Sequence, residues 1–219
     1  MDDDAKSGIW SPVILFFLLS STFVELTLQL ADAGLLGMPR LRILTYQNAA
    51  FWPGLLHGWI PNYAAQPFTM FLTYAFVHGG LMHLIFNMVT LVSLGVAVIR
   101  DVGQIGFLIV YAVSTLTGAL VFVVFTTSFQ PMVGASGALF GLAGALVWWN
   151  IVYTFQTDAT IAVKAASVIW PVTVLILLNV FMYYGFDKNV AWETHLGGFV
   201  GGVLVALFYR DHLVEDAGE

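Results

Sequence analysis

The 219-residue chain is 59% hydrophobic and only 9% charged, whereas soluble domains carry about 25% charged residues. Too few charged side chains are present to cover a water-facing surface, so the main solvent of this chain must be lipid. The net charge of −6 offers no basic surface, so no nucleic-acid partner is expected. The absence of cysteine excludes disulfides, thiol catalysis and cysteine metal sites.

Long apolar runs dominate the chain, and a membrane-spanning helix needs about 20 mostly apolar residues. The runs predict six spans, at about 9–30, 81–99, 103–127, 134–152, 162–184 and 192–210. Helices are expected rather than barrel strands, because the runs are continuous and do not alternate. The first run has no clear small-residue cleavage site, so we expect it to be retained. The sequence therefore predicts an all-α, polytopic membrane protein with a single domain over residues 1–219.

The first connection, at about 31–66, is the one long connection between the predicted spans. It contains Trp52, Trp59 and Tyr63 among several prolines and glycines. Aromatic side chains of this kind favour the membrane interface. We expect an irregular loop that is partly embedded in the membrane.

The distribution of lysine and arginine bears on orientation, because cytoplasmic loops are enriched in these residues. With the N-terminus inside, the cytoplasmic side would carry Lys6, Arg100, Lys164 and Arg210, and the outer side Arg40, Arg42 and Lys188. Four positive charges against three favour a cytoplasmic N-terminus and C-terminus.

The second, fourth and sixth predicted spans all enter the membrane from the same side. His83, Ser136 and His195 each lie near the start of one of them. A serine is a nucleophile only when a base takes its proton, and a neutral imidazole with a pKa of about 6.5 suits that role. The topology therefore predicts a Ser136–His195 dyad near one membrane face. No carboxylate is placed to orient His195, because Glu193 points elsewhere on the helix.

Acyl transfer also needs hydrogen-bond donors for the developing oxyanion. The first N–H groups of the fourth span are unpaired within the helix. His83 and Asn87 lie one turn apart on one face of the second span, so both can contribute side-chain donors. The same two residues could also form a structural polar pair that fixes the first connection.

Small residues mark the helix faces that carry this pair. Gly198 and Gly202 continue the face of His195, and Gly137, Gly141 and Gly144 form a second stripe on the fourth span. Such stripes let membrane helices pack backbone to backbone, which a serine–imidazole contact of about 3 Å requires. We therefore expect the fourth and sixth spans to be close neighbours.

Other interpretations exist for the single residues. Ser136 taken alone could be a helix-start residue, and His195 an interfacial histidine. His78 and His83 are spaced i, i+5 rather than as the i, i+4 pair of a zinc helix, and no glutamate accompanies them. We expect no metal and no other cofactor.

Three blocks of sequence together indicate a family. They read His78-Gly-Gly-Leu-Met-His83-Leu-Ile-Phe-Asn87, then Gly134-Ala-Ser136-Gly137, then His195-Leu-Gly-Gly198-Phe-Val-Gly-Gly202. In their order, spacing and position within the spans, the chain resembles the rhomboid intramembrane serine proteases of the six-span bacterial type.

The resemblance implies roles for individual residues. Ser136 would be the nucleophile and His195 the general base, with His83 and Asn87 at the oxyanion site. Further matches are Phe140, packed against the imidazole; Phe86, at a substrate gate between the second and fifth spans; His78, near a water-filled cavity; and the supporting Gly134, Gly137, Gly198 and Gly202. The implied activity is cleavage of transmembrane segments of other proteins in the bilayer, in a bacterial inner membrane.

One departure concerns the first connection. Many family members carry Trp-Arg where this chain has Thr69-Met70, which leaves the anchor of that connection open. Two other functions remain to be weighed: a catalytically silent rhomboid-like protein that binds membrane clients, and a small transporter. The absence of an internal repeat argues against a transporter.

Overall fold

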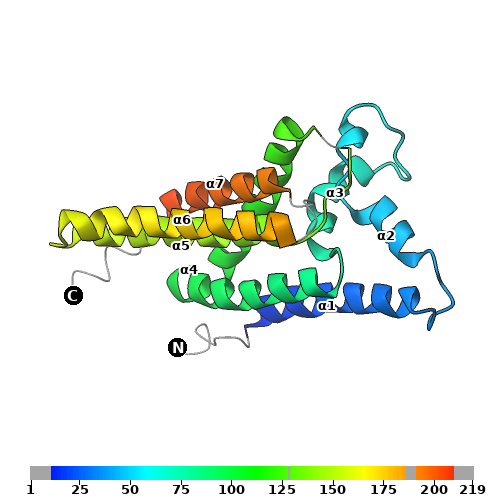
Figure 1. Ribbon diagram of the computed structural model, residues 1–219, viewed down its shortest axis with the longest axis horizontal. Coiled ribbons are helices and arrows are strands. Elements are labelled where there is room, and N and C mark those ends of the chain that lie inside the picture. The colour runs from blue at the N-terminus through cyan, green and yellow to red at the C-terminus, as the bar shows by residue number, and fades with distance from the viewer. Residues whose placement is uncertain (1–10, 128, 186–190, 210–219) are drawn as a thin grey trace.

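The computed structural model describes residues 11–127, 129–185 and 191–209 (Figure 1). Within these residues, the chain forms α1 (Pro12–Asp32), α2 (Leu41–Ala49), η2 (Pro53–Leu56), α3 (Gln66–Thr73), η3 (Tyr74–Phe76), α4 (Leu81–Phe125), α5 (Ser136–Gln156), α6 (Ile161–Gly185) and α7 (Trp192–Phe208). An all-α membrane bundle is thus confirmed. Some predictions lie outside the described residues. These are the start of the first predicted span at residues 9–10, the end of the sixth at residue 210, and the charges of Lys6, Lys188 and Arg210.

Four of the described helices, α1, α4, α5 and α6, are long and apolar enough to cross a membrane. Helix α4 covers two of the predicted spans. They are separated by a kink at Gly103, whose backbone is non-helical with φ 72° and ψ −179°. The helix turns back on itself there (Figure 1), in a left-handed conformation that glycine adopts without a Cβ penalty. Helix α7 has 17 residues, fewer than a full span of about 20. The predicted apolar segments are present, but the count of six full-length spans is not exact.

The first connection is more regular than the sequence predicted. It contains α2 and η2, and it ends where α3 begins. Pro53 and Pro67 lie in the first turns of η2 and α3, where a missing N–H costs no helical hydrogen bond. The expectation of an irregular loop was wrong, because Leu41–Ala49 form α2 and Pro53 starts η2.

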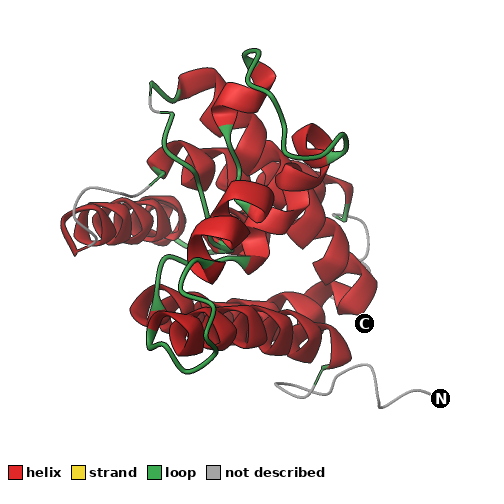
Figure 2. Ribbon diagram, turned by 90° about the vertical axis from the view of Figure 1, so that its right-hand side faces the viewer, coloured by secondary structure: helices red, strands yellow, loops and turns green. Residues whose placement is uncertain are grey.

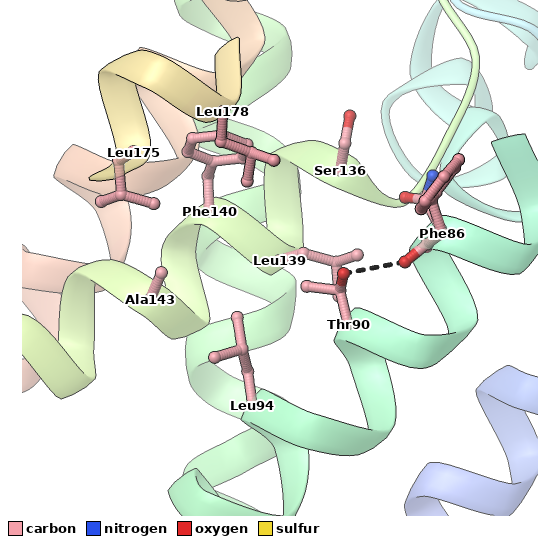
Figure 3. Close-up of a pocket in the computed structure, with 10 residues that line it drawn as sticks. Phe86, Thr90, Leu94, Ser136, Leu139, Phe140, Ala143, Leu175 and Leu178 are labelled. Atoms are coloured by element: carbon pink, nitrogen blue, oxygen red, sulfur yellow. Dashed lines mark hydrogen bonds between the residues drawn. The ribbon is translucent and has the colours of Figure 1, made fainter. Parts of the chain in front are cut away.

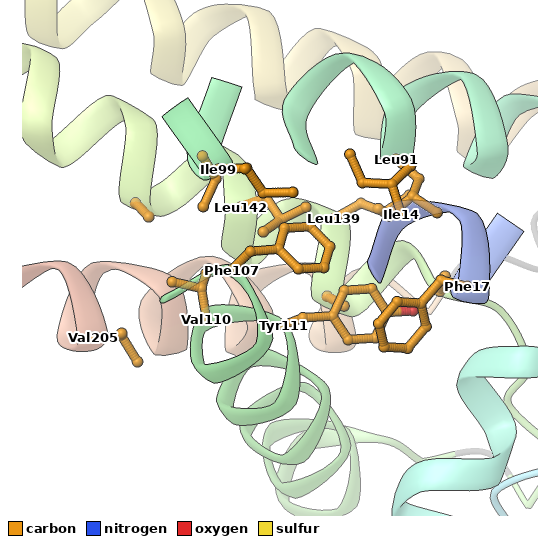
Figure 4. Packing of buried hydrophobic residues seen from close by; sticks show 14 of the residues in the cluster. Ile14, Phe17, Leu91, Ile99, Phe107, Val110, Tyr111, Leu139, Leu142 and Val205 are labelled. Atoms are coloured by element: carbon orange, nitrogen blue, oxygen red, sulfur yellow. The ribbon is translucent and has the colours of Figure 1, made fainter. Parts of the chain in front are cut away.

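A buried apolar cluster holds the bundle together (Figure 4). Ile14 of α1, Leu91 and Phe107 from the two halves of α4, and Leu142 of α5 are all 0% exposed. Val205 brings α7 into the same cluster. Because the two halves of α4 meet in this cluster, the turn at Gly103 is fixed by packing as well as by backbone geometry.

Helices α5 and α7 pack backbone to backbone through their glycines. A Cβ on Gly198 would collide with the carbonyl oxygen of Gly137, and one on Gly202 with that of Gly141. Small residues at such crossings let membrane helices approach closely. Gly137 follows Ser136 directly, and Gly198 lies one turn after His195. The crossing therefore sets the distance between the serine and the histidine.

Helix α6 is attached differently from the other long helices. None of its side chains from Ile161 to Val180 is buried, and its main neighbour is α5. In Figure 2 it lies at the left-hand side of the bundle. It is therefore the long helix whose position depends least on core packing.

Candidate active site

The first turns of α4, α5 and α7 lie at the same end of the bundle, beside α3 (Figure 1). This is the arrangement that the order of the spans predicted. Ser136 is the first residue of α5, and His195 lies in the first turn of α7. The helix starts are therefore what brings these two residues to one level.

Ser136 and His195 are in direct contact. Nε2 of His195 lies 2.9 Å from Oγ of Ser136, and the imidazole is 2% exposed. The ring of Phe140 stacks on the imidazole with centroids 4.2 Å apart and an interplanar angle of 5°. Phe140 is one turn after Ser136, so α5 supplies both the hydroxyl and the aromatic surface that holds the ring.

The other imidazole nitrogen meets a residue that the sequence analysis did not identify. Nδ1 of His195 lies 2.6 Å from Oδ1 of Asn179, on α6. The sequence predicted no carboxylate to orient His195, because Glu193 points elsewhere on the helix, and it did not predict an amide from another span. The one available signal was a lone amide within an apolar run, since polar residues inside spans are functional candidates by default.

His83 is held so that one ring nitrogen faces the segment before α5. The backbone N–H of Gly79 donates to Nδ1 of His83 at 3.2 Å, so Nε2 carries the proton of the neutral ring. A Cβ on Gly134 would lie 2.8 Å from that Nε2. Gly134 also has a φ of 116°, so both backbone conformation and space require glycine there. His83 thus presents a donor two residues before Ser136.

Asn87 is 3% exposed and lines the same pocket as Ser136. Its Nδ2 donates to the carbonyl oxygen of His83 at 2.8 Å. An amide nitrogen carries two N–H groups, so one remains after this bond. Among the described residues, Oδ1 of Asn87 has no partner. This bond lies within α4 and does not reach the first connection, so Asn87 keeps one N–H donor and one acceptor that face the pocket.

A pocket of about 110 Å³ opens beside Ser136 (Figure 3). It lies between the first half of α4, α5 and α6. Its lining is Phe86, Asn87, Thr90 and Leu94 of α4, Ser136, Leu139, Phe140 and Ala143 of α5, and Leu175 and Leu178 of α6. Most of these side chains are apolar, so the pocket suits an apolar ligand. Phe86 lies where the resemblance implied a gate, opposite α6.

His78 is buried beside this site, at the connection between η3 and α4. It is 0% exposed, and its ring meets that of His83 edge to face at 5.3 Å. Burial, and next the nearby His83, lower the pKa of His78 to about 3, so the ring is neutral at physiological pH. Its carbonyl oxygen accepts a hydrogen bond from the hydroxyl of Tyr46 at 2.9 Å. His78 thus joins the first connection to the site.

An ion pair anchors the first connection, which lacks the family's Trp-Arg. Arg42 of α2 donates to Glu25 of α1 at 3.0 Å, and Glu25 has a fully buried side chain. Arg42 also pairs with Asp32 at 2.6 Å. Burial lowers the pKa of Arg42, but the hydrogen bonds to Glu25 and Asp32 hold it above its ordinary value. The guanidinium stays charged and links α2 to the bundle.

The fold and this site define a class: polytopic helical membrane proteins with a serine and an imidazole in contact at one end of the bundle. The rhomboid domain family matches residues 65–212, which is more than half of the chain and includes Ser136, His195 and every residue that lines the pocket. The protein belongs to the rhomboid family, and it is an integral membrane protein.

Curated relatives agree with this assignment. The chain is 35% identical over 136 residues to the rhomboid protease GluP of Bacillus subtilis, covering 62% of this chain and 25% of that protein. It is 31% identical over 139 residues to the RHOMBOID-like protein 4 of Arabidopsis thaliana, covering 62% and 33%. The putative rhomboid protease YdcA of B. subtilis is 28% identical over 163 residues, covering 74% and 78%. The chain spans a quarter of the length of GluP and a third of that of RHOMBOID-like protein 4.

Proposed function

We propose that this protein is an intramembrane serine endopeptidase that cleaves transmembrane segments of other membrane proteins. The observation that supports this most is the 2.9 Å contact between Nε2 of His195 and Oγ of Ser136. That contact has the geometry of a nucleophile and its general base. Membership of a family that includes proteases supports the same reaction.

In the first step, Oγ of Ser136 attacks the scissile carbonyl carbon while Nε2 of His195 takes the hydroxyl proton. The imidazolium then gives that proton to the leaving amine, and an acyl-enzyme remains on Ser136. Water attacks this ester with His195 again as base, which releases the acid and regenerates the serine. The stacked ring of Phe140 keeps the imidazole in one plane throughout.

The tetrahedral intermediate carries a negative oxygen that needs donors. Nε2–H of His83, the second amide N–H of Asn87 and the first backbone N–H groups of α5 are the candidates. Two observations support this proposal: the His83 ring lies against Gly134, two residues before Ser136, and Asn87 lines the same pocket as Ser136. Fixed donors of this kind cost no reorganisation during the reaction.

The substrate would enter from the bilayer through the pocket between α4 and α6. The apolar lining from Phe86, Leu175 and Leu178 suits a transmembrane segment better than a soluble peptide. The scissile carbonyl of a helix is hydrogen-bonded within it, so the segment must unwind locally before Ser136 can attack. Substrates with helix-breaking residues near the cut are therefore expected to be cleaved faster.

The surroundings of the protein belong to the same proposal. The distribution of lysine and arginine favours a cytoplasmic N-terminus, and the likeness to two proteins of B. subtilis is consistent with a bacterial inner membrane. With this orientation, the site lies towards the outer face of the membrane. Water would reach Ser136 from that side, beneath the first connection.

The decisive experiment uses purified protein in liposomes with a fluorescent transmembrane reporter. Unaltered protein should cut the reporter and react with a fluorophosphonate at Ser136. Ser136→Ala and His195→Ala should lose cleavage, because general acid–base catalysis contributes about a hundredfold to ten-thousandfold. If both variants cleave at the unaltered rate, the assignment is wrong. Folded protein that neither labels nor cleaves would favour the silent member that binds membrane clients.

A further inference from the structure

Asn179 is a polar residue in a very apolar environment. It lies in α6, within a run in which Ile176, Leu177 and Leu178 precede it and Val180 follows it. An amide in the hydrocarbon region is costly unless its groups are bonded. Asn179 is nevertheless on the face of α6 that meets the first turn of α7, since its side chain reaches His195. Its position thus calls for an explanation by function.

Both polar atoms of the Asn179 side-chain amide have hydrogen-bond partners, and together these partners fix the orientation of the amide. Nδ2 donates to the carbonyl oxygen of Leu175, one turn earlier in α6, at 3.2 Å. Oδ1 is therefore the atom that faces Nδ1 of His195, at 2.6 Å. A rotated amide would place its N–H groups against the imidazole and lose the bond to Leu175. The amide is held as an acceptor.

The acceptor determines where the imidazole proton lies. Oδ1 has no hydrogen to give, so Nδ1 of His195 must donate to it, and the neutral ring then has its lone pair on Nε2. That lone pair points at Oγ of Ser136, 2.9 Å away. This is the tautomer a general base requires, and the opposite tautomer could not take the serine proton.

We propose that Asn179 is a positioning residue that holds His195 in the base-competent tautomer and stabilises the imidazolium formed during the reaction. The inference rests on the proposed function for its catalytic consequence, although the tautomer itself does not. The dyad on α5 and α7 is thereby completed by a neutral third residue from a different helix. A neutral amide supports Nδ1–H without the cost of burying a carboxylate in the membrane.

The test compares Asn179→Leu, which removes the acceptor while keeping an apolar side chain, with Asn179→Asp, which restores an acceptor oxygen. Val180→Ala, at the exposed neighbouring position on α6, is the matched control. Readouts are kcat and KM for the transmembrane reporter, the rate of fluorophosphonate labelling at Ser136, and the pH–rate profile. Nitrogen-15 NMR of labelled histidine reports which ring nitrogen of His195 is protonated.

In Asn179→Leu, kcat should fall by about tenfold to a hundredfold, which is no more than the lower end of the effect of losing the base itself, while KM stays nearly unchanged. Labelling by the small probe should slow by the same factor, because the probe needs the base but needs no space for a helix. Asn179→Asp should recover much of kcat and move the acidic limb of the pH profile to higher pH, since a carboxylate favours the charged imidazole. Val180→Ala should match the unaltered protein.

The outcomes separate the two proposals. Unchanged kcat, labelling and pH profile in Asn179→Leu would overturn the inference, as would a change confined to KM, which indicates helix packing alone. A His195 ring with its proton on Nε2 in the unaltered protein would overturn it without any activity measurement. If Ser136→Ala cleaves normally, the proposed function fails, while the NMR comparison still decides whether Asn179 sets the tautomer.

Discussion

The α5–α7 crossing, which carries Ser136 and His195, and helix α6, which lines the pocket beside them, are held by different forces. At the crossing, glycine faces glycine so closely that a Cβ on Gly198 would collide with the backbone of Gly137. Helix α6 has no buried side chain between Ile161 and Val180. The comparison indicates that the spacing of serine and base is set by rigid backbone contacts, while one wall of the pocket is free to move.

The difference in packing between the crossing and α6 affects both the access of a substrate to Ser136 and the orientation of His195. Densely packed regions transmit strain and resist local opening, whereas weakly packed elements open at low free energy. Under the proposed function, a substrate helix would displace α6 as it enters, yet α6 also carries the amide that touches His195. The base would therefore be fully oriented only when α6 returns to its place.

The largest effect is expected from Gly198→Leu. The new side chain would force α7 away from Gly137 and lengthen the Ser136–His195 contact. Cleavage should fall by about a thousandfold, within the range that loss of a positioned base produces. Thermal unfolding in detergent should also shift downward, because overpacking costs about 1–3 kcal/mol. Val200→Leu, on the exposed face of the same helix, should leave both measurements close to those of the unaltered protein.

A smaller effect is expected from Gly134→Ala, which disturbs one donor of the site without moving the dyad. The added methyl would meet the His83 ring, and the loss of one oxyanion donor costs about a hundredfold in kcat. Gly80→Ala is the matched control, because Gly80 has a φ of 127° but no atom within 4 Å of the added Cβ. Equal loss of kcat in the two variants would mean that backbone strain, and not His83, explains the effect.

The first connection should respond less in activity than in stability. Arg42→Gln leaves the buried Glu25 without its cationic partner, although Gln29 still donates a hydrogen bond to it, and breaking a buried ion pair costs about 3–5 kcal/mol. Thermal unfolding of the protein in detergent measures that cost, and the exposed Arg40→Gln is the control. The double variant Glu25→Gln and Arg42→Gln should be more stable than Arg42→Gln alone, since no unpaired charge remains. If it is less stable, the two residues do not act as a pair.

Much of the arrangement was predictable because topology is a strong constraint in membranes. Counting spans was enough to predict that the segments carrying His83, Ser136 and His195 start at one face, since alternate spans enter from the same side. The glycines of the fourth and sixth spans predicted their close crossing, because small residues mark contact faces. These signals are periodic or ordered along the chain, so they can be read without a structure. The catalytic roles remain a proposal.

Other parts depended on information that the sequence does not carry locally. The partnership of Asn179 with His195 depends on how α6 is rotated about its own axis and how far it stands from α7, and no periodic pattern sets either. Helices α2 and α3 were not predicted because each has fewer than ten residues, too short for the runs of about 20 apolar residues that mark a span. The link between Arg42 and Glu25 joins two segments whose separation only the fold determines.

The smallest effect is expected from single leucine-to-alanine substitutions in the buried core and on α6. Leu142 in the core is 0% exposed, and Leu178 on α6 is 41% exposed. Leu142→Ala should lower the free energy of unfolding by about 2–5 kcal/mol because it leaves a cavity. Leu178→Ala should change it by no more than about 0.5 kcal/mol, as exposed positions usually do, and should mainly alter KM because Leu178 lines the pocket. Equal destabilisation in the two variants would show that α6 is packed as firmly as the core, and the distinction between a rigid dyad and a movable wall would fail.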